Sequence, residues 1–180
     1  TSALHIGLKV IGVKNLDEVL LPSIGFVAIA NSVLYNNAIP HFVDSNISDF
    51  GVDPIKLNDY LKKNTYIKKN TCFNNKTHRI IRALIVVHVF GHPAQITKLI
   101  AVAKKYKIKV IEDAAEALGS LFKGKQVGTF GDIGILSFNG NKIVTSGNGG
   151  AILTNNKKYA KISKHITTTA KLNHKWDYIH

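Results

Sequence analysis

Lys142 is the residue of this sequence best placed for covalent chemistry. It ends the run SFNGNK (137–142), which joins an apolar segment at 133–136 to a glycine-rich turn. An amine close to buried strands can be partly desolvated, which lowers its pKa and makes the neutral form available as a nucleophile. A lysine that forms a Schiff base needs this setting. The alternative is an ordinary surface lysine, since the chain has 24 lysines and arginines together.

Two carboxylates precede this lysine in the sequence. Asp113 follows the apolar pair Val110 and Ile111, and ligands of open α/β sheets bind beyond the carboxyl ends of strands. Asp113 could instead cap a helix that begins at Ala114. In such a helix, Glu116 would share a face with Asp113, an arrangement suited to a metal or to acid–base work. No third metal ligand lies nearby in the sequence, so we expect no metal site.

Strands and helices are expected to alternate along the chain. Apolar runs predict strands at residues 19–21, 39–43, 80–89, 109–111 and 133–136, and one that ends at 154. Helical spacing predicts helices within 1–12, 26–33, 53–61 and 95–106, and one near the end of the chain. Asp53 is the expected N-cap of the third helix, with Pro54 in its first turn. Residues 64–78 are polar and are expected to form a surface loop. This alternation predicts a three-layer α/β/α sandwich around a mostly parallel mixed sheet.

Composition limits the class of protein. The chain has 180 residues, of which 45% are hydrophobic and 19% charged, so it is long enough for one folded domain and is not a disordered tail, a collagen-like fibre or a disulfide scaffold. Its single cysteine, Cys72, fits a reducing compartment, and we expect a cytoplasmic location. Every apolar stretch of membrane-spanning length is interrupted, so no membrane partner is expected.

The net charge of +13 points to phosphate-bearing partners. Arg79 and Arg82 are the only arginines, however, and the lysine pairs are scattered along the chain. Reading of base edges depends strongly on arginine, so a solvated basic surface is favoured over nucleic-acid binding. A phosphorylated small molecule is compatible with this charge.

Four segments in combination resemble a known family. They are EDAAEALGS (112–120), GTFGDIG (128–134), SFNGNK (137–142) and GNGG (147–150). Together they resemble the DegT/DnrJ/StrS family of sugar aminotransferases, pyridoxal 5'-phosphate enzymes of the aspartate-aminotransferase fold type. The resemblance extends to residues 1–5, 25–28 and 87–93, and the order of the motifs is kept.

The resemblance implies a role for each matching residue. Lys142 matches the lysine that forms the internal aldimine, and Asp113 matches the aspartate that keeps the pyridine nitrogen protonated. Glu116 stands beside the ring hydroxyl, where many members carry glutamine.

Other matching residues would hold the rest of the cofactor. Ser137, Thr1 and Ser2 match ligands of the phosphate group, which would lie at a helix N-terminus. Phe26 matches the residue that stacks on the ring.

The implied reaction moves an amino group, from glutamate, to a nucleotide-linked keto-sugar for surface polysaccharide or glycan biosynthesis. Residues 174–180 resemble the branch that makes amino sugars for nonulosonic acids or related surface glycans. Members are homodimers about twice as long as this chain. Residues 1–180 are therefore expected to be the central part of the cofactor-binding large domain, without its N-terminal start and the C-terminal small domain. The alternative is a catalytically silent fragment or a non-enzymatic regulatory homologue.

Overall fold

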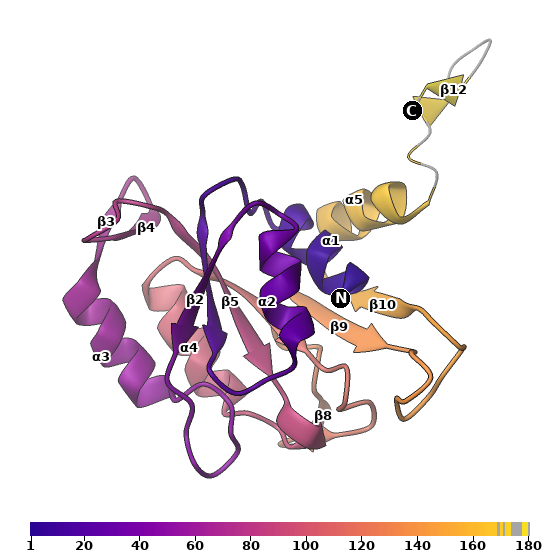
Figure 1. Cartoon of the computed structure of the whole chain (residues 1–180), viewed down its shortest axis with the longest axis horizontal. Coiled ribbons are helices and arrows are strands. Elements are labelled where there is room, and N and C mark those ends of the chain that lie inside the picture. Colours follow the sequence, from indigo (N-terminus) through magenta and orange to yellow (C-terminus); the bar gives the residue numbers. More distant parts are fainter. Residues whose placement is uncertain (169, 171, 174–177, 180) are drawn as a thin grey trace.

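A six-stranded sheet forms the centre of the protein, with helices on both faces (Figure 1). The computed structural model describes residues 1–168, 170, 172–173 and 178–179. The sheet strands are β1 (Glu18–Pro22), β2 (Ile39–Val43), β5 (Ile81–Val87), β6 (Lys109–Asp113), β9 (Ile133–Ser137) and β10 (Gly150–Leu153). The helices are α1 (Ser2–Val10), α2 (Val27–Leu34), α3 (Pro54–Asn64), α4 (Ile96–Lys105) and α5 (Lys157–Thr167).

The sheet is mixed but mostly parallel, as predicted. Its strand order is β10-β9-β6-β5-β1-β2, and only the β9–β10 pairing is antiparallel. The three central strands that we expected in one sheet are neighbours, with Leu84 opposite Val110 and Ile111 opposite Ile133. Because these strands are parallel, their carboxyl ends meet at one edge of the sheet.

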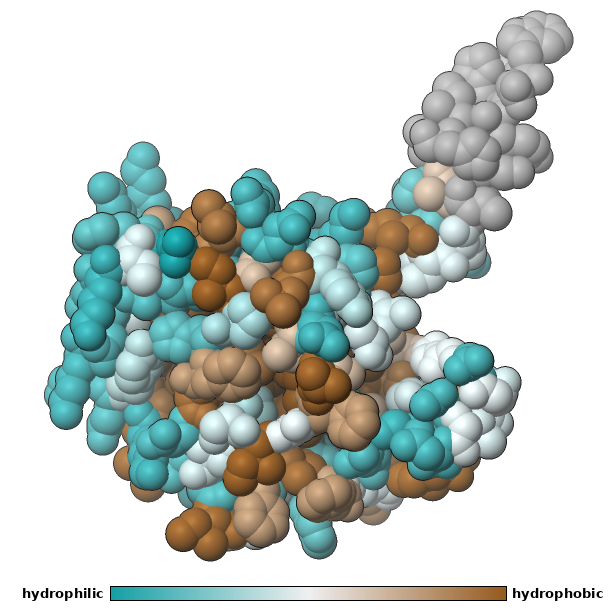
Figure 2. Space-filling model, viewed as in Figure 1, coloured by the Kyte–Doolittle hydropathy of each residue, from teal (hydrophilic) through white to brown (hydrophobic). Residues whose placement is uncertain are grey.

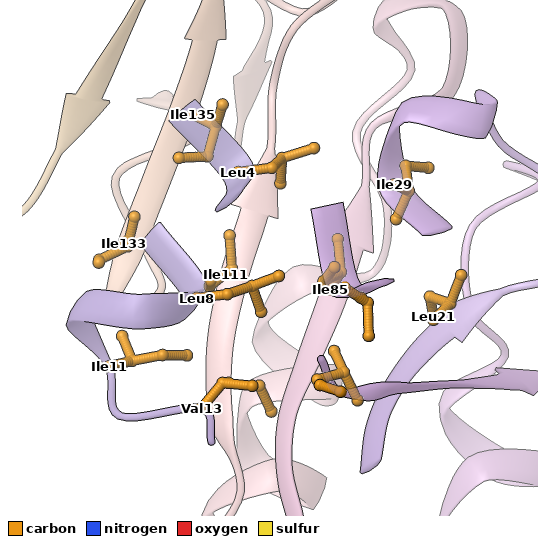
Figure 3. Packing of buried hydrophobic residues seen from close by; sticks show 14 of the residues in the cluster. Leu4, Leu8, Ile11, Val13, Leu21, Ile29, Ile85, Ile111, Ile133 and Ile135 are labelled. Atoms are coloured by element: carbon orange, nitrogen blue, oxygen red, sulfur yellow. The ribbon is translucent and has the colours of Figure 1, made fainter. Parts of the chain in front are cut away.

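Successive side chains of the central strands point to opposite faces of the sheet, and each face carries its own hydrophobic core. On one face, Leu4 and Leu8 of α1 pack in a cluster with Ile85, Ile111 and Ile135 (Figure 3). Helices α2 and α5 add to this cluster. On the other face, α3 and α4 pack in a cluster with the alternate strand positions. A strand that is buried on both faces needs a continuous apolar run, and β5 shows one at residues 83–87.

The start of α3 shows how local chemistry sets an element boundary. Asp53 Oδ1 accepts hydrogen bonds from the backbone N–H groups of Ile55 (2.8 Å) and Lys56 (3.1 Å), and Pro54 occupies the first helical position. An N-cap aspartate followed by proline satisfies or removes the free donors of the first turn. The predicted cap is confirmed.

The prediction of a surface loop over residues 64–78 is wrong. A hairpin of β3 (Thr65–Lys68) and β4 (Thr71–Asn74) lies there, and Cys72 is fully buried. Its tight turn places Lys69 (φ 47°) and Asn70 (φ 59°) in the left-handed region. Two successive left-handed residues form a two-residue hairpin turn whose twist matches that of the flanking strands. Such turns usually carry asparagine or aspartate followed by glycine, so a lysine at the first position gave no sequence indication of a hairpin.

The alternative in which Asp113 caps a helix that begins at Ala114 is wrong. Residues 114–120 form successive turns, in which Ala117 N donates to Ala114 O and Ser120 N donates to Ala117 O, both at 3.0 Å. The N–H of Ala114 donates to Ile135 O, so the backbone continues its pairing with β9 beyond Asp113. Asp113 is therefore the last residue of a strand and not the cap of a helix.

The remaining elements are short. They are the 3-10 turn η1 (Val89–Gly91) and the strands β7 (Leu121–Phe122), β8 (Lys125–Gln126), β11 (Leu172–Asn173) and β12 (Tyr178–Ile179). The residues at 174–180 on which a family branch was inferred lie outside the described residues, apart from the backbone of β12. Within the described part of the chain, every helix is too short or too polar to cross a membrane.

Candidate active site

A cavity of about 940 Å³ lies where the carboxyl ends of β6 and β9 meet the start of α1. The surface is hollowed between α5 and the glycine-rich loop that follows β9 (Figure 2). Six of the seven residues singled out from the sequence line this cavity: Thr1, Ser2, Phe26, Asp113, Ser137 and Lys142. The structure therefore brings together residues from segments that lie far apart in the sequence.

Asp113 provides a buried carboxylate at the end of β6. The residue is 7% exposed, and its Oδ1 accepts a hydrogen bond from the N–H of Ala115 at 3.1 Å. Burial raises the pKa of Asp113, while the Ala115 N–H and the Lys142 ammonium act in the opposite direction. A carboxylate in this position is ionised more readily when a cation lies against it. The site therefore favours a ligand that presents a protonated nitrogen to Asp113.

Glu112, which the sequence analysis did not select, fixes the end of the same strand. Its Oε1 accepts from the N–H groups of Phe130 and Gly131, both at 2.6 Å, and its Oε2 accepts from Gly128 N at 2.9 Å. Burial would raise the pKa of Glu112, but hydrogen bonds from His88 and from the backbone hold it below the ordinary value. Glu112 thus anchors the loop before β9 while the next residue, Asp113, lies in the cavity.

His88 completes this buried network. Its Nε2 lies 3.1 Å from Glu112 Oε2, and its Nδ1 accepts the N–H of Ala94 at 3.1 Å. Because Nδ1 is an acceptor, the ring proton lies on Nε2 and is donated to Glu112. In the sequence, Glu112 could have been noticed because it directly precedes Asp113 in the EDAAEALGS motif. Its structural role could not be inferred there, because its hydrogen-bond partners lie in other segments of the chain.

Lys142 lies between a carboxylate and an aromatic ring. Its Nζ is 3.1 Å from Glu116 Oε1 and 5.6 Å from the centroid of the Phe26 ring. The Lys142 side chain is 13% exposed and that of Glu116 is 38% exposed. Glu116 does not line the cavity itself, so its link to the site is the ion pair with Lys142.

The start of α1 presents anion-binding groups to the cavity. Thr1 occupies the N-cap position but makes no side-chain capping hydrogen bond, and the first turn holds no acidic residue. Helix N-terminal N–H groups without such partners, together with the helix dipole, favour an anion. Ser2 and Ser137, which carry hydroxyl groups, also line this cavity.

The polar residues of the cavity wall that were not selected from the sequence include three asparagines. Asn139, Asn141 and Asn148 line the cavity, and Asn139 Nδ2 donates to Asn141 Oδ1 at 3.1 Å. The sequence could have indicated these asparagines, because they lie in the SFNGNK and GNGG segments that resemble the family. Among the described residues, no group of three or more His, Cys, Asp or Glu side chains could hold a metal ion.

A family model matches almost the whole chain. The model of the DegT/DnrJ/EryC1/StrS aminotransferase family matches residues 1–179. The chain belongs to this family. GDP-perosamine synthase of Escherichia coli O157:H7 is 41% identical over 157 residues, which are 87% of this chain and 39% of that protein.

Solved structures of the family share the fold. A DegT DnrJ EryC1 StrS aminotransferase from Brucella abortus has a TM-score of 0.85 and 26% identity, and the match covers 99% of this chain and 46% of that one. The structure of ntda from Bacillus subtilis with bound cofactor PMP has a TM-score of 0.74 and 32% identity, over 92% of this chain and 34% of that one. The chain thus spans less than half the length of these relatives.

Proposed function

We propose that the longer protein to which this chain corresponds is a pyridoxal-phosphate-dependent aminotransferase. It would move an amino group from an amino-acid donor, glutamate, to a nucleotide-linked keto-sugar used in surface polysaccharide or glycan biosynthesis. The observation that carries the proposal is the meeting of Asp113, Lys142 and the start of α1 in one cavity. Family membership and the named activity of the perosamine synthase relative support the choice of reaction.

The residues of the cavity match the parts of pyridoxal phosphate. The start of α1, with Ser2 and Ser137, offers donors for a phosphate group, and Asp113 offers a carboxylate for a protonated ring nitrogen. The Phe26 ring, 66% exposed, offers an apolar face for stacking. When bound, the cofactor acts as an electron sink for the carbon that loses its proton. The PMP-bound relative supports this cofactor class.

The chain's own residues would divide the work in the cavity. Lys142 would supply the nucleophilic amine and, once freed, would carry a proton between a carbon of the substrate and a carbon of the cofactor. Glu116, at 3.1 Å, would hold the Lys142 ammonium in place before the amine is needed. Asp113 would hold the protonated ring nitrogen of the cofactor, and its burial excludes water from that contact.

The same proposal extends to assembly, location and domain position. We infer that residues 1–180 form the central part of a cofactor-binding large domain, because the relatives are more than twice as long as the matched segment. We also infer a cytoplasmic homodimer that takes nucleotide-sugar and amino-acid substrates. A silent homologue is disfavoured, because such a protein has no need to keep both Asp113 and Lys142 in one cavity.

Borohydride trapping of the complete protein tests the proposal. We expect reduction to attach the cofactor to Lys142, as located by peptide mapping. The Lys142→Ala variant should lose turnover and keep part of its cofactor binding, because charge, hydrogen bonds and stacking do not depend on the covalent bond. Lys157→Ala is a matched control on an exposed helix start. Attachment to another lysine, or wild-type turnover by Lys142→Ala, would refute the assignment.

A further inference from the structure

A groove of about 540 Å³ lies at the end of the sheet where β6 begins, opposite the end that carries the candidate active site. Its wall includes the last turn of α4, the first residues of β6 and the loop that precedes β9. Strand β6 begins in this groove at Lys109 and ends in the active-site cavity at Asp113. The two hollows are therefore separated by the length of a strand, and a ligand in one does not touch the other.

Cationic side chains dominate the groove. Arg82, Lys104, Lys107 and Lys109 line it, against the single carboxylate of Asp132. Two of these cations are held by neighbours. Arg82 Nε lies 2.9 Å from Asp17 Oδ2, and Lys109 Nζ lies 2.9 Å from Asp132 Oδ1.

The other two cations are available to a ligand. Within the described part of the chain, neither Lys104 nor Lys107 has a carboxylate within ion-pair distance, and both are exposed. The turn that carries them is well defined, because Lys107 N donates to Lys104 O (3.2 Å) and Ile108 N donates to Ala103 O (2.9 Å). These bonds satisfy the carbonyl groups of Ala103 and Lys104 in the last turn of α4, which reduces the negative partial charge that the helix end presents to an anion.

An unusual backbone conformation places one of these ammonium groups. Lys107 has φ 62°, in the left-handed region that favours glycine at the end of a helix. A lysine at this position gives the groove a cation where glycine would give none.

An apolar wall lies beside the cations. Ile100, Ile108 and Phe130 line the groove, and the Phe130 ring is partly exposed. The Nζ of Lys125 lies 4.6 Å from the centroid of that ring. A hollow of this size with a few polar anchors and an apolar wall is typical of sites for small organic molecules.

We propose that this groove binds a diphosphate-class anion, either free or carried by an organic group such as a nucleoside. Two free ammonium groups beside two paired cations favour a ligand with several negative charges over a single carboxylate. The concave shape favours a small molecule over an extended polyanion. The volume leaves room for an organic group against Ile108 and Phe130. The proposal does not depend on the aminotransferase function.

Methyl-labelled isoleucine spectra of the complete, cofactor-loaded protein would test this site. Ile100 and Ile108 report on the groove, and Ile135 and Ile152 report on the active-site cavity. We expect titration with pyrophosphate to shift the Ile100 and Ile108 signals saturably. ADP is the second probe: tighter binding than pyrophosphate would indicate an organic carrier, and equal binding would indicate the free diphosphate. Either result supports the site.

Matched variants separate specific binding from general charge effects. Lys104→Gln/Lys107→Gln should weaken pyrophosphate binding about tenfold, the loss expected for two exposed ion pairs. Lys62→Gln/Lys63→Gln removes the same charge from the last turn of α3, outside the groove, and should change binding less than about twofold. Unfolding midpoints of both variants should match the parent, since the four lysines are exposed. The absence of saturable shifts at Ile100 and Ile108, or equal losses in both variants, would overturn the proposal.

Discussion

Lys142 Nζ lies 3.1 Å from Glu116 Oε1, and this contact joins the loop after β9 to the turns after β6. The pair is partly exposed on the Glu116 side. An ion pair of this kind stabilises by a small amount, since water screens it. It is strong enough to position an amine and weak enough to release it, as the proposed covalent role of Lys142 requires.

Glu116→Gln should therefore speed the covalent attachment of the cofactor to Lys142. The amide keeps the size of the side chain but removes the ion pair that the amine must leave. An exposed pair of about 0.2–1 kcal/mol corresponds to a gain of about 1.4- to 5-fold in rate. Stopped-flow absorbance of the complete protein mixed with pyridoxal phosphate measures this rate. Asp59→Asn, which removes a carboxylate of α3 outside the cavity, is the control. A slower attachment in Glu116→Gln would show that the carboxylate assists the step.

Asp113→Asn should separate stability from activity. Burial raises the pKa of Asp113 above its ordinary value near 3.8. The cofactor-free fold therefore loses stability as the pH rises through that raised pKa, and the loss is absent below the ordinary value. The asparagine variant does not titrate, so the cofactor-free variant should be at least as stable as the parent at pH 7, by urea unfolding.

Turnover of the loaded Asp113→Asn variant should fall on the order of a hundredfold, because a neutral amide holds a protonated ring nitrogen poorly. Asp132→Asn, at the other edge of the sheet, should leave turnover unchanged. Wild-type turnover in Asp113→Asn would contradict the role given to this carboxylate.

Glu18 should control acid stability. Burial would raise its pKa, but hydrogen bonds from His41 (2.7 Å), Thr77 (2.5 Å) and Asn74 (2.9 Å) outweigh burial and hold it at about 2, against an ordinary 4.5. A lowered carboxylate pKa gives stability that is present above pH 4.5 and is lost as the pH falls toward 2. The shift corresponds to roughly 3 kcal/mol at most.

The test is denaturant unfolding of the parent and of Glu18→Gln between pH 2 and 6. The slope of stability against pH between about 4.5 and 2 should be smaller in the variant, because the amide that replaces the carboxylate does not titrate. Asp44→Asn provides a control, since Asp44 is 69% exposed and pairs with Lys56 on the surface. Identical slopes in Glu18→Gln and the parent would remove Glu18 as the cause.

Gly134→Ala, in β9, should be strongly destabilising. A Cβ at this position would overlap the carbonyl oxygen of Gly128, a backbone atom that the Glu112 network holds in place. We expect a loss of about 3 kcal/mol or more in the free energy of unfolding. Gly124→Ala is the matched control. It has φ 77° and nothing within 4 Å, so only backbone strain of about 1 kcal/mol applies. Equal losses in the two variants would contradict the steric argument.

The sequence predicted the elements whose pattern is local. The continuous apolar run of β5 and the Asp53 cap of α3 are each visible within a few residues, and both are confirmed. The hairpin at residues 65–74 was missed because its turn depends on left-handed conformations of Lys69 and Asn70. The turns after Asp113 were missed because the N–H of Ala114 pairs with Ile135, a contact between distant residues.

The candidate site was predicted through family resemblance more than through chemistry. Its position in the sequence alone did not distinguish Lys142 from the other lysines. The fold does distinguish it, because Lys142 lines one cavity with Asp113 and Phe26. The catalytic and cofactor-binding roles stay predictions. The network of Glu112 and His88 could not be read from the sequence, since its five hydrogen bonds join four separate segments. Buried polar networks depend on which backbone groups the finished fold leaves free.

The packing of α1 against β9, β10 and α5 has a consequence for the order of folding. Helix α1 docks on elements that lie more than a hundred residues later in the sequence, so Ser2 and Ser137 come to line one cavity only after the intervening strands have paired. Closing so long a loop is slow, and it becomes favourable only when the contacts at its ends have formed. During synthesis, the cavity that Ser2 and Ser137 line would therefore form only after β9 and β10 have been made. A ligand that contacts both ends would then slow the undocking of α1, and protection of the α1 amides from hydrogen exchange should rise when the cavity is filled.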